Sequence, residues 1–426
     1  MIKNLICIFA LLFSLKSFSE TKEWSVFIFM AGDNDLSSYA VKDMMELERF
    51  IPGEKNLGSS TKKVNIVVEM KNSFSAESKR FLVKQQRELK FLNIPAADIK
   101  DDSFIHSPVI SSGTGDNQEE RFKNFLSWGI QNYPAKKYAI IIWGHGEGYI
   151  GKTEDHSQKT FGGVAFDNSS NTFIDIPTLK EILKETQTNL LNNKAIDLLI
   201  FDACLMQSIE VALELSDVAS FLIGSVQIQD YLGLPYRKLA DFLNQTPSPS
   251  AHTVATSLPT IYKQSVLEHP SSRRAESFES FTLSSLNMGD VKQILKYDLK
   301  NLKKAVTNYL LEDRFRELTF RFMIEDTPQF LGGTVDIGIL MGMIKEYLYN
   351  DSSNTLGAKN LLKAVNNVLD ALNRSVLSYQ FGPMYLERRT NPRENYLRGF
   401  FKGISWRIPE NFLSTIEKER RHQFFK

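Results

Sequence analysis

Cys204 and His145 are the two residues whose types and surroundings best suit nucleophilic chemistry. Cys204 follows the apolar run Ile196–Phe201, and His145 follows the apolar run Tyr138–Trp143. If both runs are strands of one parallel sheet, their carboxyl ends meet at the same edge and bring the thiol to the imidazole. A cysteine beside a histidine base is the arrangement that activates a sulfur nucleophile. The alternative is a structural cysteine near an unrelated loop histidine.

Two further features of these strand ends bear on the same chemistry. Apolar residues at positions 205, 209, 212 and 213 predict a helix over Leu205–Leu215. That helix would place Cys204 at its N-terminus, where the dipole favours the thiolate. Gly146 leaves its backbone N–H unobstructed, so this group and the Cys204 N–H form a candidate oxyanion hole for an acyl-transfer intermediate.

A phosphate-binding loop is a competing interpretation of the same region. Gly146–Thr153 matches the pattern G-x-x-x-x-G-K-[ST], and Asp202 ends an apolar strand as the Mg²⁺-side aspartate of a P-loop NTPase does. Such a loop needs a helix to begin at its Lys-Thr pair. Glu154–Thr172 instead carries two adjacent glycines and several Asp, Asn and Ser residues, and the next predicted helix begins near Pro177. The NTPase is therefore the weaker alternative.

The histidines, cysteines and carboxylates show no familiar metal-ligand spacing, so we predict no metal site. His145-Gly-Glu147 resembles the start of a zinc deaminase signature, but the paired cysteines that must follow are absent. The acidic turn Asp33-Asn34-Asp35 permits Ca²⁺, and a solvated cap of the next helix is the alternative. The sequence therefore requires no cofactor and leaves Ca²⁺ open.

The elements that must position these residues alternate along the chain. Short apolar runs rich in Val, Ile and Phe are typical of strands buried on both faces, and helical patterns lie between them. This alternation predicts an α/β fold with a mostly parallel sheet and helices on both faces. The predicted strands are Trp24–Met30, Asn65–Met70, Tyr138–Trp143, Ile196–Phe201 and Phe221–Val226, and the helices are Leu36–Arg49, Glu119–Ile130, Pro177–Asn192 and Leu205–Leu215.

The pattern changes after about residue 240, where helices dominate. We predict a catalytic domain over residues 20–312 and a C-terminal α+β accessory domain over residues 313–426. The later predicted elements are helices at Ala251–Leu267, Met288–Glu312, Val335–Tyr349 and Asn360–Leu377 and a strand at Gly403–Pro409.

The first 19 residues are predicted to be a cleaved export signal. Lys3 precedes the apolar run Leu5–Leu15, and Ser17 and Ser19 supply the small residues that a signal peptidase reads. The run is too short to span a bilayer. Cleavage would leave Cys204 as the only cysteine and lower the formal net charge from +1 to −1. This charge gives no argument for nucleic acid or an anionic membrane as partner.

At several points the chain resembles the clostripain family of cysteine peptidases, relatives of caspases, legumain and gingipains. The likeness lies in Trp24–Leu36, in Ile140–Gly146 around His145 and in Asp197–Ser208 around Cys204. Weaker likenesses lie at Thr282–Asn287, Val335–Ile337 and Gly403–Pro409. The resemblance implies a caspase-like α/β/α sandwich and a Cys204/His145 dyad that hydrolyses peptide bonds.

The resemblance also implies cleavage after Arg or Lys, with acidic residues lining the pocket. Asp202 matches one such acid, but Leu232 stands where the family has the second. Family members are often activated by self-cleavage between the histidine and the cysteine, and Lys159 in the loop Glu154–Thr172 is a candidate site. We therefore expect an exported cysteine endopeptidase acting on polypeptides. A catalytically silent binding protein on the same fold is the alternative, and the oligomeric state is open.

Overall fold

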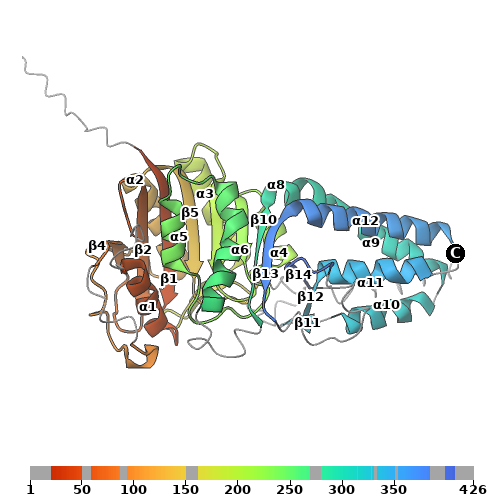
Figure 1. Cartoon of the computed structure of the whole chain (residues 1–426), viewed down its shortest axis with the longest axis horizontal. Helices are drawn as coiled ribbons and strands as arrows, with labels where there is room; N and C mark the ends of the chain where they lie inside the picture. Colours follow the sequence, from red (N-terminus) through yellow and green to blue (C-terminus); the bar gives the residue numbers. More distant parts are fainter. Residues whose placement is uncertain are drawn as a thin grey trace, which may run out of the picture.

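The protein, represented by a computed structural model, is built on a nine-stranded sheet (Figure 1). The structure describes residues 21–49, 59–86, 94–149, 162–268, 280–313, 315–327, 329–330, 333–350, 354–383 and 399–407. The strands, in sheet order, are β13 (Val376–Phe381), β10 (Thr282–Asn287), β9 (Ala219–Gly224), β8 (Ile196–Asp202), β5 (Ala135–Trp143), β1 (Lys22–Gly32), β2 (Val64–Asn72), β3 (Lys79–Leu82) and β4 (Val109–Ser112).

The centre of the sheet is parallel and its edges are antiparallel. The five strands from β9 to β2 run in one direction, whereas β10, β13, β3 and β4 pair antiparallel with their neighbours. Met30 of β1 pairs with Trp143 of β5, and Trp143 pairs with Asp202 of β8. The carboxyl ends of these three strands therefore lie level at one edge.

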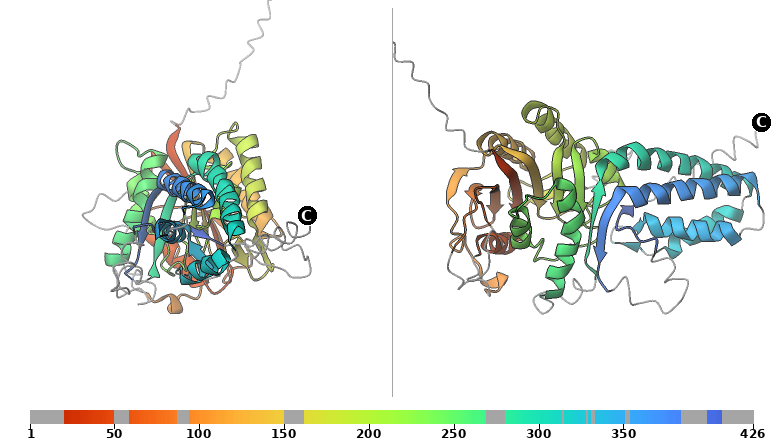
Figure 2. Two further views of the ribbon diagram at one scale, coloured as in Figure 1. Left: turned by 90° about the vertical axis from the view of Figure 1, so that its right-hand side faces the viewer. Right: turned by 45° about the horizontal axis from the view of Figure 1, so that its top comes forward.

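Alternate side chains of the sheet enter two separate cores. On β1, Phe27 and Phe29 pack with α2 (Gln118–Asn132), α3 (Ile176–Leu190) and α4 (Ile209–Leu215). Val26, Ile28 and Met30 pack on the other face with α1 (Ser37–Glu48), α5 (Tyr236–Leu243) and α6 (Ala251–Glu268). Figures 1 and 2 show the sheet between these layers, and the predicted α/β/α sandwich is confirmed.

The C-terminal part extends the molecule beyond the β10–β13 edge (Figure 1). Its helices are α8 (Met288–Asp290), the π-helical η3 (Val291–Leu295), α9 (Lys296–Glu312), α10 (Phe315–Asp326), α11 (Ile337–Asn350) and α12 (Leu356–Ser375). A small sheet joins β11 (Gln329–Phe330), β12 (Thr334–Asp336) and β14 (Ser405–Trp406). Strand β13 returns to the central sheet beside β10, so the two parts share one sheet. The domain boundary after residue 312 stays a prediction.

The predicted strands and helices are present with ends shifted by a few residues, apart from the helix after Cys204 described below. The elements that the sequence did not predict are β3, β4, α5, α10, the strands β10, β11, β12 and β13, and the hairpin of β6 (Val164–Asp167) and β7 (Thr172–Ile174). Residues 1–19, the Lys-Thr pair at 152–153 and Lys159 lie outside the described residues.

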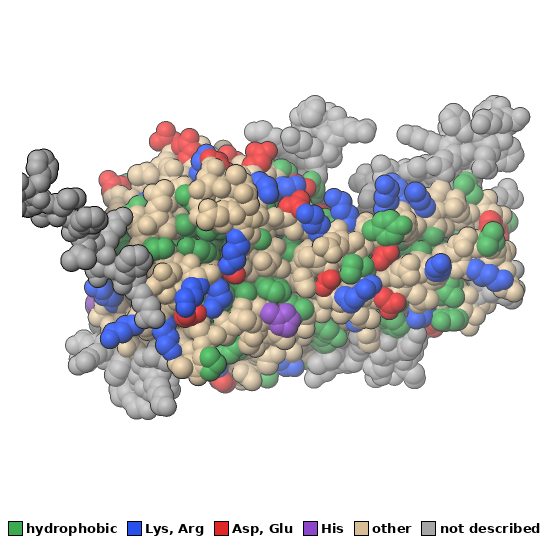
Figure 3. Space-filling view, turned by 90° about the horizontal axis from the view of Figure 1, so that it is seen from above, with side chains coloured by type: hydrophobic (Ala, Val, Ile, Leu, Met, Phe, Trp, Pro, Cys, Tyr) green, Lys and Arg blue, Asp and Glu red, His purple; other side chains and the backbone are tan. Residues whose placement is uncertain are grey.

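Two surface properties follow the composition. Over the described part of the chain, no helix is both long and apolar enough to cross a bilayer. On the face seen in Figure 3, basic and acidic side chains are interspersed, as a formal net charge of +1 leads us to expect.

Candidate functional site

Cys204 and His145 lie at the same edge of the central sheet. Each stands two residues beyond the paired positions Asp202 and Trp143 that end β8 and β5. Both residues line one cavity of about 740 Å³, which Asp202 and Gly146 also line. The structure thus brings together every predicted site residue that it describes.

Gly146 is where the two strand-end loops approach most closely. A Cβ atom at this position would lie 2.5 Å from the Cys204 carbonyl oxygen and 3.0 Å from the Ala203 Cβ. Only glycine leaves room for the two backbones to touch there. In the described part of the chain, neither the Gly146 N–H nor the Cys204 N–H donates to a backbone carbonyl.

The hairpin β6–β7 holds the loop after β5 that carries His145. The Ala165 N–H donates to the His145 carbonyl at 3.0 Å, and the Glu147 N–H donates to the Gly163 carbonyl at 3.0 Å. Gly146 and Val164 form an antiparallel bridge between these bonds. The backbone on both sides of His145 is therefore fixed by the hairpin.

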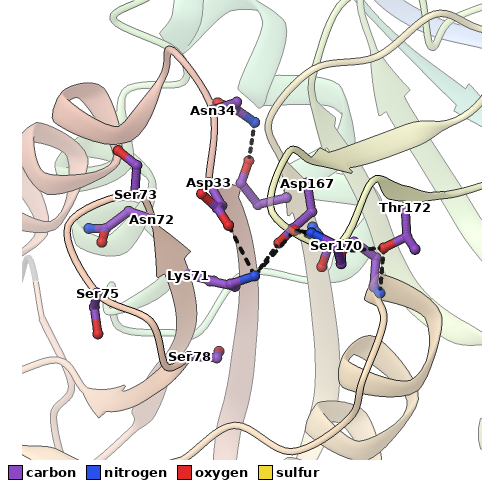
Figure 4. Close-up of polar contacts among 12 residues, drawn as sticks. Asp33, Asn34, Lys71, Asn72, Ser73, Ser75, Ser78, Asp167, Ser170 and Thr172 are labelled. Carbon is purple, nitrogen blue, oxygen red and sulfur yellow. Dashed lines mark hydrogen bonds and ion pairs between the residues drawn. The ribbon is translucent and has the colours of Figure 1, made fainter.

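A buried ion network fixes the hairpin in turn (Figure 4). Lys71 Nζ lies 3.0 Å from Asp167 Oδ2 and 3.0 Å from Asp33 Oδ2, the latter an ion pair without hydrogen-bond geometry. Arg121 Nη2 donates to Asp167 Oδ2 at 2.6 Å, and Ser170 donates to Asp167 Oδ1 through both its N–H and its hydroxyl. Burial acts to raise the pKa of Asp167, but these hydrogen bonds outweigh it and lower the pKa to about 2. Asp167 is therefore held ionised.

Cys204 does not stand at a helix N-terminus, and that prediction was wrong. Leu205 takes a left-handed conformation with φ of 62°, and α4 begins only at Ile209 with Ser208 as its N-cap. The Gln229 N–H donates to Cys204 Sγ at 3.2 Å. Burial, and with it the Asp202 charge, raises the pKa of the Cys204 thiol despite this bond. Cys204 is therefore a neutral thiol and not the expected thiolate, so it needs a base to become a nucleophile.

His145 has a partner that the sequence analysis did not assign to it. Its Nε2 lies 2.6 Å from Oδ1 of Asp35, and the two side chains are 40% and 70% exposed. Asp35 follows β1, the strand next to β5, and was assigned to a cap or a Ca²⁺ turn. The position of Asp35 after the first apolar run could have indicated this contact, because the carboxyl ends of parallel strands meet at one edge.

Asp202 is a buried carboxylate at the end of β8. Its Oδ2 accepts from the Tyr236 hydroxyl at 2.8 Å and from the Leu234 N–H at 3.1 Å. Burial, and then the Asp202 charge, raises the pKa of Asp43 well above its ordinary value, so Asp43 stays protonated beside Asp202. The negative charge at this end of the cavity is therefore carried by Asp202.

Asp230 lines the same cavity, whereas Leu232, at the position of the expected second acid, is not among the described residues that do so. Asp230 is 7% exposed, and its Oδ1 accepts from the Leu232 N–H at 2.8 Å. A ring stack between Tyr231 and Tyr39 fixes the same loop. A second carboxylate thus stands at the cavity two residues before the position that the motif indicated.

The side chains of the turn considered for Ca²⁺ contact other residues of the chain. Asp33 pairs with Lys71, Asp35 contacts His145, and Asn34 Oδ1 accepts from the Leu36 N–H at 2.9 Å. Within the described ranges, no group of three or more His, Cys, Asp and Glu side chains could hold a metal ion. Ca²⁺ dependence, which the sequence leaves open, stays untested.

Comparison with known proteins gives a family and a fold. The sequence model of the clostripain family matches residues 28–395. A secreted C11 cysteine protease from Bacteroides thetaiotaomicron, solved with an irreversible peptide inhibitor, is 20% identical at a TM-score of 0.57, over 94% of this chain and 96% of that one. An inactive zymogen C11 protease from Parabacteroides distasonis is 16% identical at a TM-score of 0.55, over 94% and 96%. No curated protein matches the sequence.

Proposed function

Because the chain belongs to the clostripain family and is a cysteine-type peptidase, we propose that Cys204 is its nucleophile and His145 its acid and base. The observation that carries this proposal is the register of β5 and β8, which sets both residues at one cavity. The P-loop NTPase interpretation is wrong for this family, and polypeptides are the substrates.

The raised pKa of the Cys204 thiol defines the order of proton transfers. Since the thiol is neutral, His145 accepts its proton as the sulfur attacks the carbonyl carbon of the scissile peptide. The C–N bond then breaks, the leaving amine takes the proton from the imidazolium, and a thioester remains on Cys204. Water, deprotonated by His145, hydrolyses the thioester and restores the thiol.

The oxyanion formed during attack needs donors beside the sulfur. The N–H groups of Gly146 and Cys204 are the proposed pair, supported by the contact between their backbones. Donors that are already in place stabilise the transition-state charge without reorganisation, and losing one typically costs about 10²–10³ in kcat.

We further propose that the residue on the acyl side of the scissile bond is Arg or Lys, held by the charges of Asp202 and Asp230. Both carboxylates line the cavity and are shielded from water, which strengthens their attraction for a cation. The absence of an acid at Leu232 therefore does not remove the basis for this preference.

Kinetics with peptide substrates test the dyad and the specificity separately. Cys204→Ala and His145→Ala should each remove nearly all activity on every substrate while leaving the unfolding midpoint close to that of the wild type. Asp202→Asn and Asp230→Asn should lower kcat/KM for Arg and Lys substrates by at least about tenfold more than for a norleucine substrate. Retained turnover in Cys204→Ala would contradict the proposed dyad. Equal losses on all three substrates in Asp202→Asn and Asp230→Asn would contradict the preference for Arg and Lys alone.

We also propose that the protein is exported from the cytoplasm. Its support is the apolar run Leu5–Leu15 followed by Ser17 and Ser19. The N-terminus of the protein recovered outside the cytoplasm should begin at Glu20. A protein confined to the cytoplasm with residues 1–19 retained would contradict export and leave the peptidase assignment untouched.

A further inference from the structure

We infer that Asp35 is a positioning residue for His145, so that the reacting group is a Cys204–His145–Asp35 triad. The inference rests on the proposed dyad and adds a third member to it. Asp35 contacts the imidazole and not the substrate, because it acts through the 2.6 Å contact between its Oδ1 and His145 Nε2.

The sheet topology places the three residues in spatial order. Strands β1, β5 and β8 are consecutive neighbours, and the pairs Met30–Trp143 and Trp143–Asp202 set their ends level. Each strand contributes one residue just beyond its end, Asp35 after β1, His145 after β5 and Cys204 after β8. The histidine therefore lies between its acid and its nucleophile across one sheet edge.

The turn that carries Asp35 is rigid although Asp35 itself is exposed. Asn34 is 8% exposed, and its Nδ2 donates to the Ala31 carbonyl at 3.0 Å and to the Phe166 carbonyl at 2.9 Å. Asp33 pairs with Lys71 through its side chain, and its carbonyl accepts from the Asn168 N–H at 2.9 Å. The residues before Asp35 are thus tied to β6 and to the turn after it.

His145 is tied to the same hairpin by the Ala165 and Glu147 hydrogen bonds. The segments that carry Asp35 and His145 are therefore both held against the same hairpin, which fixes the distance between the two residues. A chance surface ion pair has no such support on either side, and pairs of that kind contribute little to stability.

The contact selects the form of the imidazole that the reaction needs. A carboxylate accepts a hydrogen bond from Nε2–H, which leaves the lone pair on Nδ1 to take the thiol proton. When Nδ1 is protonated, the Asp35 charge stabilises the imidazolium that results. Asp35 thus sets the tautomer before attack and assists the charged state after it.

The test compares Asp35→Ala, Asp35→Asn and Asp35→Glu with the exposed control Asp98→Asn, in the full chain. We expect Asp35→Ala and Asp35→Asn to lower kcat/KM by about tenfold, on basic and norleucine substrates alike, with unchanged unfolding midpoints. Asp35→Glu should recover part of the loss. The loss should fall on kcat rather than on KM, because Asp35 contacts the imidazole and not the substrate.

Salt provides an independent readout of the same contact. Because the pair is largely exposed, about 1 M NaCl should lower the kcat of the wild type towards that of Asp35→Asn. Asp35 variants with the activity of Asp98→Asn would overturn the inference. A loss matched by a lower unfolding midpoint, or one that Asp35→Glu does not partly recover, would also overturn it by making Asp35 structural. Retained activity in Cys204→Ala would instead reject the underlying dyad.

Discussion

Asp167→Asn tests whether the buried ion network holds the hairpin that braces His145. The Asp167 side chain is fully buried, and it accepts from Lys71, Arg121 and Ser170. Asparagine keeps the shape and one acceptor oxygen but removes the charge. Arg121 and Lys71 then remain buried with less compensation, although Lys71 retains Asp33.

Two routes give the size of the effect. Breaking a buried ion pair from one side costs about 3–5 kcal/mol, and the oxygen that asparagine keeps for Ser170 favours the lower end. The pKa of Asp167 is lowered from an ordinary value near 4 to about 2, which corresponds to about 2.5 kcal/mol at neutral pH. We therefore expect Asp167→Asn to lower the free energy of unfolding by about 3 kcal/mol.

Urea unfolding at several pH values is the appropriate assay, in a Cys204→Ala background that prevents self-digestion. Because the folded-state pKa of Asp167 is depressed, its contribution is present above the unfolded pKa of about 4 and is lost as pH falls towards 2. The difference between parent and variant should accordingly shrink between about pH 5 and pH 3.

The exposed residue Asp370 supplies a matched control for this substitution. Asp370→Asn should change the free energy of unfolding by no more than about 0.5 kcal/mol. The reasoning is refuted if Asp167→Asn costs no more than this control, or if its cost is the same at pH 3 as at pH 7.

Three further predictions concern the cavity and the chain around it. Gly146→Ala should lower kcat/KM by about a hundredfold, because its Cβ would push the two strand-end loops apart. The control is Gly289→Ala, whose Cβ meets only the Asn287 side chain at 3.3 Å and which should not lower kcat/KM. Equal activities of the two variants would contradict this prediction. The rate of alkylation of free Cys204 by iodoacetamide should keep rising with pH beyond the range in which an ordinary thiol levels off, since its pKa is raised. Fast alkylation at pH 6 would refute the neutral thiol. If the chain cleaves itself at Lys159, the wild type should separate into two fragments on a denaturing gel and Lys159→Gln should remain one chain. An unchanged fragment pattern would exclude that site.

The parallel core could be predicted because its signal is local. Buried parallel strands are continuous apolar runs, and Val26–Met30 and Leu198–Phe201 have this form. The same rule predicts that His145 and Cys204 lie at one edge. Asp35 satisfied that rule equally well but was assigned to a helix cap, because a single acidic turn has several local uses.

The missed elements depend on distant partners. The apolar spacing after Cys204 indicated a helix from Leu205. The Leu205 N–H instead donates to the Gln227 carbonyl and the Gln207 N–H to the Ser225 carbonyl, and these bonds hold the segment outside a helix. Strand β13 follows α12 because it pairs with β10, nearly a hundred residues earlier in the chain. The family motif predicts the second acid at position 232, where Leu232 stands, whereas the acid that lines the cavity is Asp230.

Labelling with a peptidyl electrophile that carries Lys at the position before the reactive carbon tests the central claim most directly. Peptide mapping by mass spectrometry then locates the covalent adduct. We predict a single adduct on Cys204, absent in Cys204→Ala and strongly slowed in His145→Ala, because the neutral thiol needs the imidazole to lose its proton. An adduct on another residue, or labelling of Cys204 at the wild-type rate in His145→Ala, would contradict the proposed dyad.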